Sequence, residues 1–178
     1  MAEKVLFRAV DAPDVHWHDV LRALEIAEEM FHTQTDADQM LLNAGYARWV
    51  VSVIPCCWTL IVLGGTVVGG QFVLPTSIDM MRSFLGGNLS ERAMMDEVRE
   101  NGARDWDALY LAGATVVPDH RRKGLALEAL SRTVEGIAKR RAARLELFYW
   151  PFSTEGRSLV TRFVARTGWN VHERNTSG

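Results

Sequence analysis

The chain has 178 residues, of which 48% are hydrophobic and 24% are charged, and its formal net charge is −2. This length suits one domain, residues 1–178, with a sizeable core, and the composition is ordinary for a soluble globular protein. A net acidic chain argues against a protein that grips nucleic acid mainly through phosphate charge, so we expect no nucleic-acid partner. The first residues contain no long apolar segment, so we expect no signal peptide and a cytoplasmic protein.

The charges are distributed unevenly along the chain. Residues 1–118 contain 8 basic and 16 acidic side chains, a net charge of −8, whereas residues 119–178 contain 12 basic and 6 acidic side chains, a net charge of +6. A basic C-terminal part suits the binding of a polyanionic cofactor.

The N-terminal part begins with a strand and a helix. Residues 5–10 predict a strand, and residues 14–31 predict an amphipathic helix with Asp14 as its N-cap. A shorter helix at 36–43 and a strand at 48–54 are expected to follow.

An uncharged stretch covers residues 49–78 and is long enough to imitate a membrane span. Prolines and glycine pairs interrupt it, and it is rich in Val, Ile and Thr. This pattern predicts buried strands at 57–63 and 66–74, joined by a tight turn at Gly64-Gly65, and no membrane association.

Two clusters could suggest redox or metal chemistry. Cys56 and Cys57 are adjacent in the uncharged stretch, and buried free thiols are the expected state, with a vicinal disulfide as the alternative. His16 and His18 would point in different directions on a helix, so we expect no metal site.

Residues 77–102 predict one or two helical pieces that are split at Gly86-Gly87. Methionines and other apolar residues recur along this segment. They indicate core packing, with a flexible apolar lid as the alternative.

The C-terminal part alternates strands and helices. A strand at 109–117 leads through a short loop into a helix at 124–141, and a strand at 144–150 follows. A helix capped by Ser153 or Thr154 ends at Gly168, before a last strand at 169–174. The whole order predicts an α/β (α+β) fold, with a mixed, mostly antiparallel sheet of six or seven strands flanked by helices.

The loop at 118–126 has the composition of a phosphate site. A loop rich in Arg and Gly that opens a helix presents free backbone N–H groups and the positive end of the helix dipole to an anion. Gly124 and the small Ala126 let the backbone approach a ligand closely, and three basic side chains can add charge-assisted hydrogen bonds: Arg121, Arg122 and Lys123. A basic turn without a ligand is the alternative.

The residues of this loop resemble a known family. Val116, Pro118, Arg121, Gly124 and Ala126 occur in the order of the acyl-CoA loop of the GNAT N-acyltransferase superfamily. Residues 162–169 resemble the aromatic-rich helix end of the same family, with Gly168 and Trp169 before the next strand. The two matches together cover about residues 105–171.

The resemblance implies a GNAT-type N-acetyltransferase. Such an enzyme moves an acetyl or other acyl group from acetyl-CoA, or another acyl-CoA, to a primary amine by direct attack in a ternary complex, without a metal. Strands 109–117 and 144–150 would splay apart, and backbone groups near Val116 and Val117 would hold the pantetheine. The backbone N–H groups of Arg122, Lys123, Gly124, Leu125 and Ala126 would hold the pyrophosphate. The family's link is usually shorter at 77–102, so we expect a helical insertion there.

The catalytic residues depart from the family's pattern. Where many relatives have a Tyr acid on the last helix, this chain has Val164, and where many have a Glu base on the strand before the loop, it has Tyr110. Tyr110 and Tyr149 are the candidates for proton transfer. Packing of half-buried rings is the alternative for both.

The acceptor is expected to be a small-molecule or peptide amine, and a cationic one. In the family, the first helices and their connecting loop wall the acceptor cleft, and here they carry the carboxylates of Asp14, Asp19, Glu25, Glu28, Glu29, Asp36 and Asp38. A solvated helix face is the alternative for these acids. A non-catalytic acyl-CoA-binding or sensor module is the alternative function, and a homodimer is allowed for.

Overall fold

The computed structural model describes residues 4–102, 106–141 and 144–175. They form one six-stranded sheet in which the strands lie in chain order. The strands are β1 (Val5–Ala9), β2 (Trp58–Leu63), β3 (Thr66–Thr76), β4 (Ala108–Val116), β5 (Glu146–Tyr149) and β6 (Val171–Glu173). β1 to β4 pair antiparallel, whereas β5 is parallel to β4 and β6 is parallel to β5. The predicted mixed, mostly antiparallel sheet is confirmed.

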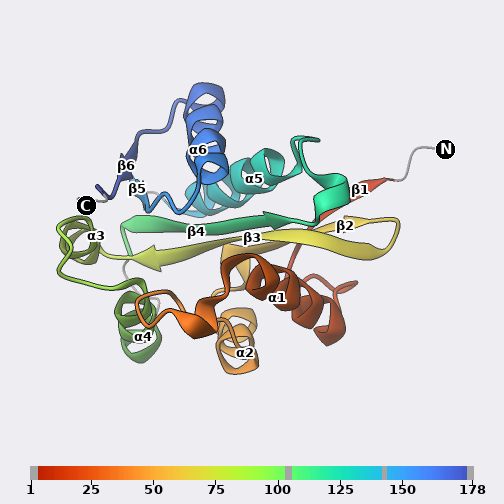
Figure 1. The fold of residues 1–178 in the computed structure, drawn as a ribbon, viewed down its shortest axis with the longest axis horizontal. Coiled ribbons are helices and arrows are strands. Elements are labelled where there is room, and N and C mark those ends of the chain that lie inside the picture. Colours follow the sequence, from red (N-terminus) through yellow and green to blue (C-terminus); the bar gives the residue numbers. More distant parts are fainter. Residues whose placement is uncertain (1–3, 103–105, 142–143, 176–178) are drawn as a thin grey trace.

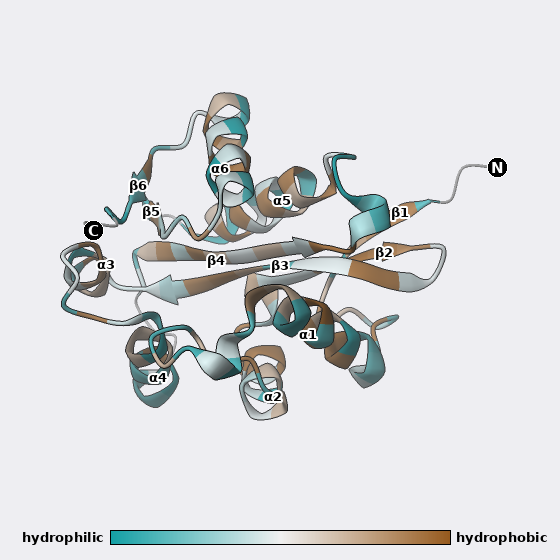
Figure 2. Ribbon diagram, viewed as in Figure 1, coloured by the Kyte–Doolittle hydropathy of each residue, from teal (hydrophilic) through white to brown (hydrophobic). Residues whose placement is uncertain are grey.

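Helices cover both faces of the sheet, as Figure 1 shows. On one face lie α1 (Trp17–Phe31), α2 (Ala44–Val53) and α4 (Glu91–Asn101), and on the other lie α5 (Leu125–Arg140) and α6 (Thr154–Thr167). α3 (Ile78–Leu85) lies near one end of β3 and β4. Figure 2 shows brown and teal alternating along the helices, as expected for helices that bury one side against a sheet.

The N-cap of helix α1 lies two residues after Asp14, the predicted N-cap. Its N-cap is His16, whose backbone N–H donates to the Asp19 carboxylate at 2.8 Å. Asp14 instead accepts a hydrogen bond from the Arg8 side chain at 2.8 Å. The carboxylate three residues inside the helix therefore replaced Asp14 as the group that satisfies the first turn.

The prediction was wrong for the helix at 36–43 and for the strand at 48–54. Residues 36–43 form an irregular loop, and α2 covers most of the predicted strand. The Asn43 side chain accepts from Tyr46 N at 2.9 Å and starts α2, which buries Ala47 and Val50. β-branched residues favour strands only weakly, and here a good cap and a buried helical face outweigh that preference.

The uncharged stretch folds largely as predicted beyond residue 54. Pro55 opens a short 3₁₀ helix (Pro55–Cys57), and β2 and β3 turn at Gly64-Gly65, whose φ angles are 56° and 83°. No helix within the described ranges is long and apolar enough to cross a membrane. Cys56 and Cys57 are free thiols with their sulfurs 3.9 Å apart; Cys57 is buried as predicted, whereas Cys56 is half-buried.

Residues 77–102 contain the two predicted helical pieces, α3 and α4, which are separated at Gly86-Gly87. Their apolar side chains are core residues and not a mobile lid, since they are almost fully buried: Met81, Phe84, Met94, Met95 and Val98. That this segment is an insertion stays a prediction.

Candidate active site

The parallel strands β4 and β5 separate in the middle of the sheet. β5 pairs with β4 only from Ala108 to Tyr110, although β4 continues to Val116 beside β3. Residues 111–116 therefore have no strand partner on the β5 side. Such a gap gives an extended ligand access to unpaired backbone groups of a strand.

A β-bulge lies where the two strands separate. On β3, Leu74 pairs with Tyr110 and Phe72 pairs with Gly113, so β4 has one residue more than β3 between these pairs. A bulge bends a strand and turns its side chains to a new direction. It directs β4 away from β5 and brings Ala112 and Gly113 to the helix α1 side, where both line a cavity.

The loop that enters α5 is held by its own backbone and by Arg121. His120 N donates to Val117 O at 3.0 Å, and the Arg121 Nε donates to Val116 O at 2.9 Å. Arg122 and Gly124 have positive φ angles of 60° and 77°, which turn the chain into the helix. Within the described ranges, no acceptor takes the backbone N–H groups of residues 122–127. These N–H groups lie unpaired at the start of a 16-residue helix, where the sequence predicts an anion site.

The residues expected to hold the pantetheine have different roles in the structure. Both backbone groups of Val117 are used, because its N–H donates to Val68 O at 2.9 Å and its carbonyl accepts from His120. Successive residues of a strand direct these groups to opposite edges. Val116 and Ala114 therefore face the gap. The Val116 carbonyl accepts from the Arg121 side chain, and Ala114 is a position on the gap that the sequence motif did not reveal.

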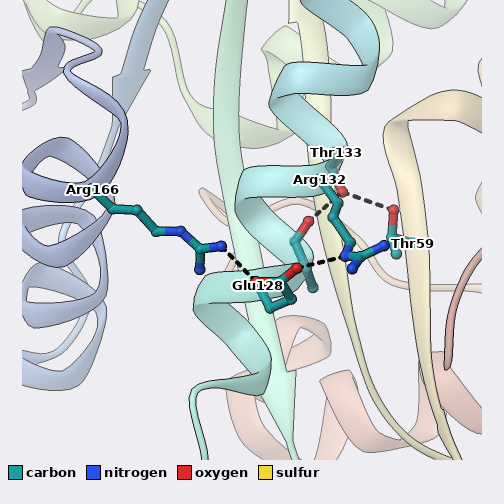
Figure 3. A network of polar contacts seen from close by, with 6 residues as sticks. Thr59, Glu128, Arg132, Thr133 and Arg166 are labelled. Carbon is teal, nitrogen blue, oxygen red and sulfur yellow. Dashed lines mark hydrogen bonds and ion pairs between the residues drawn. The ribbon is translucent and has the colours of Figure 1, made fainter. Parts of the chain in front are cut away.

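A cluster of charges joins the two helices beside the gap (Figure 3). Glu128, in the first turn of α5, accepts from Arg132 on α5 and from Arg166 on α6, each at 2.7 Å. The Arg166 contact, followed by the Arg132 contact, lowers the pKa of Glu128. The Thr133 and Thr59 hydroxyls, 2.7 Å apart, join α5 to β2 in the same view. The start of α5 is thereby fixed to the sheet and to α6.

A cavity of about 90 Å³ lies on the other face, between α1, α2, the 33–43 loop and the sheet. Its walls are mainly apolar and include Leu24, Phe31, Met40, Val50, Phe72 and Met95. The polar side chains among its lining residues are Thr33, Gln39, Asn43, Tyr46, Trp58, Glu91 and Thr115. Phe152, which precedes α6, also lines the cavity and is 42% exposed, so it marks the opening.

The acidic residues expected around the acceptor do not line this cavity. Asp14 pairs with Arg8, Asp19 caps α1, and Glu28 accepts from the Thr33 backbone and hydroxyl. They stabilise local structure or face solvent. The carboxylate that does line the cavity is that of Glu91, in a segment that sequence reasoning assigned to packing.

Glu91 is buried at the first position of α4, with 4% of its surface exposed. One oxygen accepts from Met40 N and the other from the Tyr110 hydroxyl, both at 2.7 Å. Burial raises the pKa of Glu91, against the lowering effect of these two hydrogen bonds. An acidic residue in a first helical turn is common, so no sequence signal distinguished it.

The two predicted catalytic tyrosines are buried. Tyr110 is fully buried and does not line the cavity, and burial raises its pKa well above the usual value. Tyr149 donates its hydroxyl to Glu173, which also pairs with Arg157 at 2.8 Å. Burial, followed by the Glu173 contact, raises the pKa of Tyr149 to about 12. Val164, on the outer side of α6, is 37% exposed.

No protein-family model and no curated protein sequence matches the chain. Its structure is similar to the aminoglycoside N-acetyltransferase AAC(6′)-Iy in complex with CoA, with a TM-score of 0.57, 10% identity, and coverage of 100% of this chain and 95% of that one. The chain has the GNAT acetyltransferase fold. The GNAT fold also occurs in the loading GNATL domain of CurA from Lyngbya majuscula (TM-score 0.51, 12% identity, 81% and 65% coverage).

A third similar structure is a diaminobutyrate acetyltransferase from Paenibacillus lautus in complex with its substrate and coenzyme A. It has a TM-score of 0.44 and 16% identity, with coverage of 74% of this chain. The chain spans 57% of the length of that protein.

Proposed function

We propose that this protein transfers an acetyl or other acyl group from acyl-CoA to a primary amine within a ternary complex. The observation that carries the proposal is the open edge of β4, which extends from the unpaired N–H groups at the start of α5 to the cavity on the α1 side. Its GNAT fold, which it shares with a CoA-bound aminoglycoside acetyltransferase, supports the same activity.

The residues present fit an acyl-CoA molecule. The N–H groups of residues 122–127 suit the pyrophosphate, and the basic side chains of Arg122 and Lys123 lie on the same exposed loop. The unpaired edge of β4 suits the amide groups of the pantetheine arm. Nothing lies within 4 Å of the point that a Cβ of Gly124 would occupy, which leaves the loop open to a ligand.

The reaction needs a neutral amine that is held in the correct orientation toward the acyl carbon. The amine nitrogen bonds to the acyl carbon, the carbon–sulfur bond breaks, the nitrogen loses a proton and the CoA thiolate gains one. The cavity adjoins the open edge through Ala112, Gly113 and Thr115, so an amine held there would face the acyl group. Proximity of this kind is a major part of catalysis by direct transfer.

Replacing Gly124 tests where CoA binds. Gly124→Glu places bulk and negative charge against the proposed pyrophosphate site, and we expect calorimetry to show at least a tenfold loss of CoA affinity. Gly87→Glu is the matched control, because Gly87 also has a positive φ, of 78°, and an empty Cβ position, but lies between α3 and α4. Undiminished affinity in Gly124→Glu, with CoA bound by the wild type, would refute the placement.

The alternative function is that of an acyl-CoA-binding module without turnover. Val164 at the usual place of the acid, and the engagement of the Tyr149 hydroxyl by Glu173, favour it. Tight acetyl-CoA binding without acylation of any amine would support this alternative over the enzyme.

A further inference from the structure

If the protein is an N-acyltransferase, as proposed above, its acceptor must fit a cavity that has one buried carboxylate and apolar walls. We propose that Glu91 binds the ammonium group of a small apolar monoamine, of the alkyl or arylalkyl class, and takes the proton that the amine must lose. Met40 and Tyr110 act as positioning residues for this carboxylate.

Glu91 is buried with hydrogen bonds but without an ion pair. Its two hydrogen bonds leave lone pairs on both oxygens, and no ion pair joins it to a basic side chain in the part of the chain that the structure describes. A carboxylate buried without a cationic partner is costly. Because Glu91 lines the cavity, an ammonium bound there would supply the missing charge.

Glu91 lies next to β4 at the point where the pairing of β4 with β5 ends. Tyr110, which donates to Glu91, is the last residue of β4 that pairs with β5. The bulge and the open edge begin at the next residue. The carboxylate is therefore held near the start of the open edge and in the cavity where the amine is proposed to bind, as a base for the attacking amine must be.

The 33–43 loop forms the wall of the cavity opposite the sheet, and the start of α4 binds this loop. Arg92, which follows Glu91, binds the 33–43 loop: its backbone N–H donates to Asp38 O at 3.1 Å, and its side chain donates to Gln39 O at 3.1 Å and Asp36 O at 3.0 Å. Glu91 also accepts from Met40 of this loop. The start of α4 thus supplies the charge and fixes the wall around it.

The walls determine the class of amine. Trp58, Phe31 and Phe72 line the cavity and suit an aliphatic or aromatic body. The volume of about 90 Å³ is several times what one water needs, which is about 10–15 Å³. A second ammonium inside would be desolvated without a counter-charge, because Glu91 is the sole carboxylate among the described lining residues. A polycation is therefore a poor acceptor.

The proton passes from the ammonium nitrogen to a Glu91 oxygen, which frees the nitrogen lone pair. The nitrogen then attacks the acyl carbon, the carbon–sulfur bond breaks, and the nitrogen releases its second proton to solvent. The departing thiolate takes up one proton from solvent, and Glu91 returns its own proton to solvent after the reaction. Burial raises the pKa of Glu91 above its usual value, which makes it a stronger base than an exposed glutamate. The other charged or titratable groups that act on Glu91 are Asp36 in the loop, Tyr110 on β4 and Arg174 after β6.

The test compares Glu91→Gln with Glu97→Gln, an exposed acid on the same helix. With acetyl-CoA and 2-phenylethylamine or hexylamine at neutral pH, we expect Glu91→Gln to lower kcat by about 10²-fold and to raise the amine KM. CoA affinity should stay within about twofold of the wild type. Alkaline pH should restore part of the lost rate, because the free amine then needs no base.

One further measurement distinguishes the outcomes. In the wild type, spermidine should be acylated at least tenfold less efficiently than 2-phenylethylamine, and this comparison remains decisive if Glu91→Gln does not fold. Turnover of amines with unchanged kcat and KM in folded Glu91→Gln, or a preference for spermidine, would overturn this inference alone. Absence of turnover with every amine would overturn the proposed function itself.

Discussion

At the scale of single residues, the proposed site depends on two buried side chains, Tyr110 and Glu91, that are joined by a hydrogen bond. Tyr110 on β4 occupies the position where the family resemblance places a glutamate, and it donates to Glu91 of helix α4. In the proposed site the carboxylate therefore comes from α4. A pattern of residues along β4 could not reveal this, since the partners are 19 residues apart and meet only in the fold.

Tyr110→Phe should lower kcat for an apolar amine by about tenfold and flatten its pH dependence, because Glu91 loses one of its two positioning hydrogen bonds. Tyr149→Phe should change turnover little, since that hydroxyl is bonded to Glu173. Initial rates between pH 6 and 10 measure both effects. Full turnover by both variants at every pH would remove both tyrosines from the mechanism.

Gly69 is a backbone contact between β3 and β4. A Cβ there would lie 2.1 Å from the Thr115 carbonyl oxygen, so Gly69→Ala must push the two strands apart. We expect a loss of unfolding free energy of about 1–3 kcal/mol, measured by urea denaturation. Gly65→Ala is the control, because its Cβ position is empty and any loss there comes from the φ of 83° alone. Equal losses in the two variants would show that the close approach is relieved at no cost.

At the scale of elements, the C-terminal half follows its sequence closely. The capping Ser153, Gly168 and the basic end of α5 give local signals that agree with the tertiary packing, so strand and helix limits are predicted within a few residues. The prediction for residues 36–54 was wrong because a run of β-branched residues was interpreted as a strand and the Asn43 cap was overlooked. The cavity wall lies in this region, so its shape could not be anticipated.

The contact between α5 and α6 predicts a pH-dependent stability. The pKa of Glu128 is lowered in the folded state, so its ion pairs stabilise the protein above the pKa of the unfolded chain, about 4.3, and that contribution is lost as the pH falls through the folded-state value. Glu128→Gln should cost at most about 1 kcal/mol at pH 7, as partly exposed pairs do, and nothing near pH 2.

The measurement for this prediction is chemical denaturation at both pH values. Glu135→Gln, an exposed acid on the same helix, serves as the control. A difference between Glu128→Gln and the wild type that persists undiminished at pH 2 would contradict the assignment to the carboxylate charge.

At the scale of the whole molecule, the sequence was sufficient for the fold class and for the place of the loop that enters α5, whose anion binding stays a prediction. Both depend on short-range patterns: apolar alternation, glycine positions and the order Arg-x-x-Gly-x-Ala. The expectation of a cationic acceptor was drawn from the carboxylates of the first helices and their connecting loop, and none of these lines the cavity. The cavity would select its ligand through the side chains that line it, and these come from segments distant in sequence: α1, α2 and α4, the 33–43 loop, strands β2 to β4, and Phe152.

Acyl transfer from acyl-CoA to an amine is tested most directly by mass spectrometry of the product. Wild-type protein incubated with acetyl-CoA and 2-phenylethylamine should yield the N-acetylated amine in step with free CoA thiol. Gly124→Glu should yield neither above the rate without protein. Tight binding of acetyl-CoA with no amide from any amine between pH 6 and 10 would contradict the account.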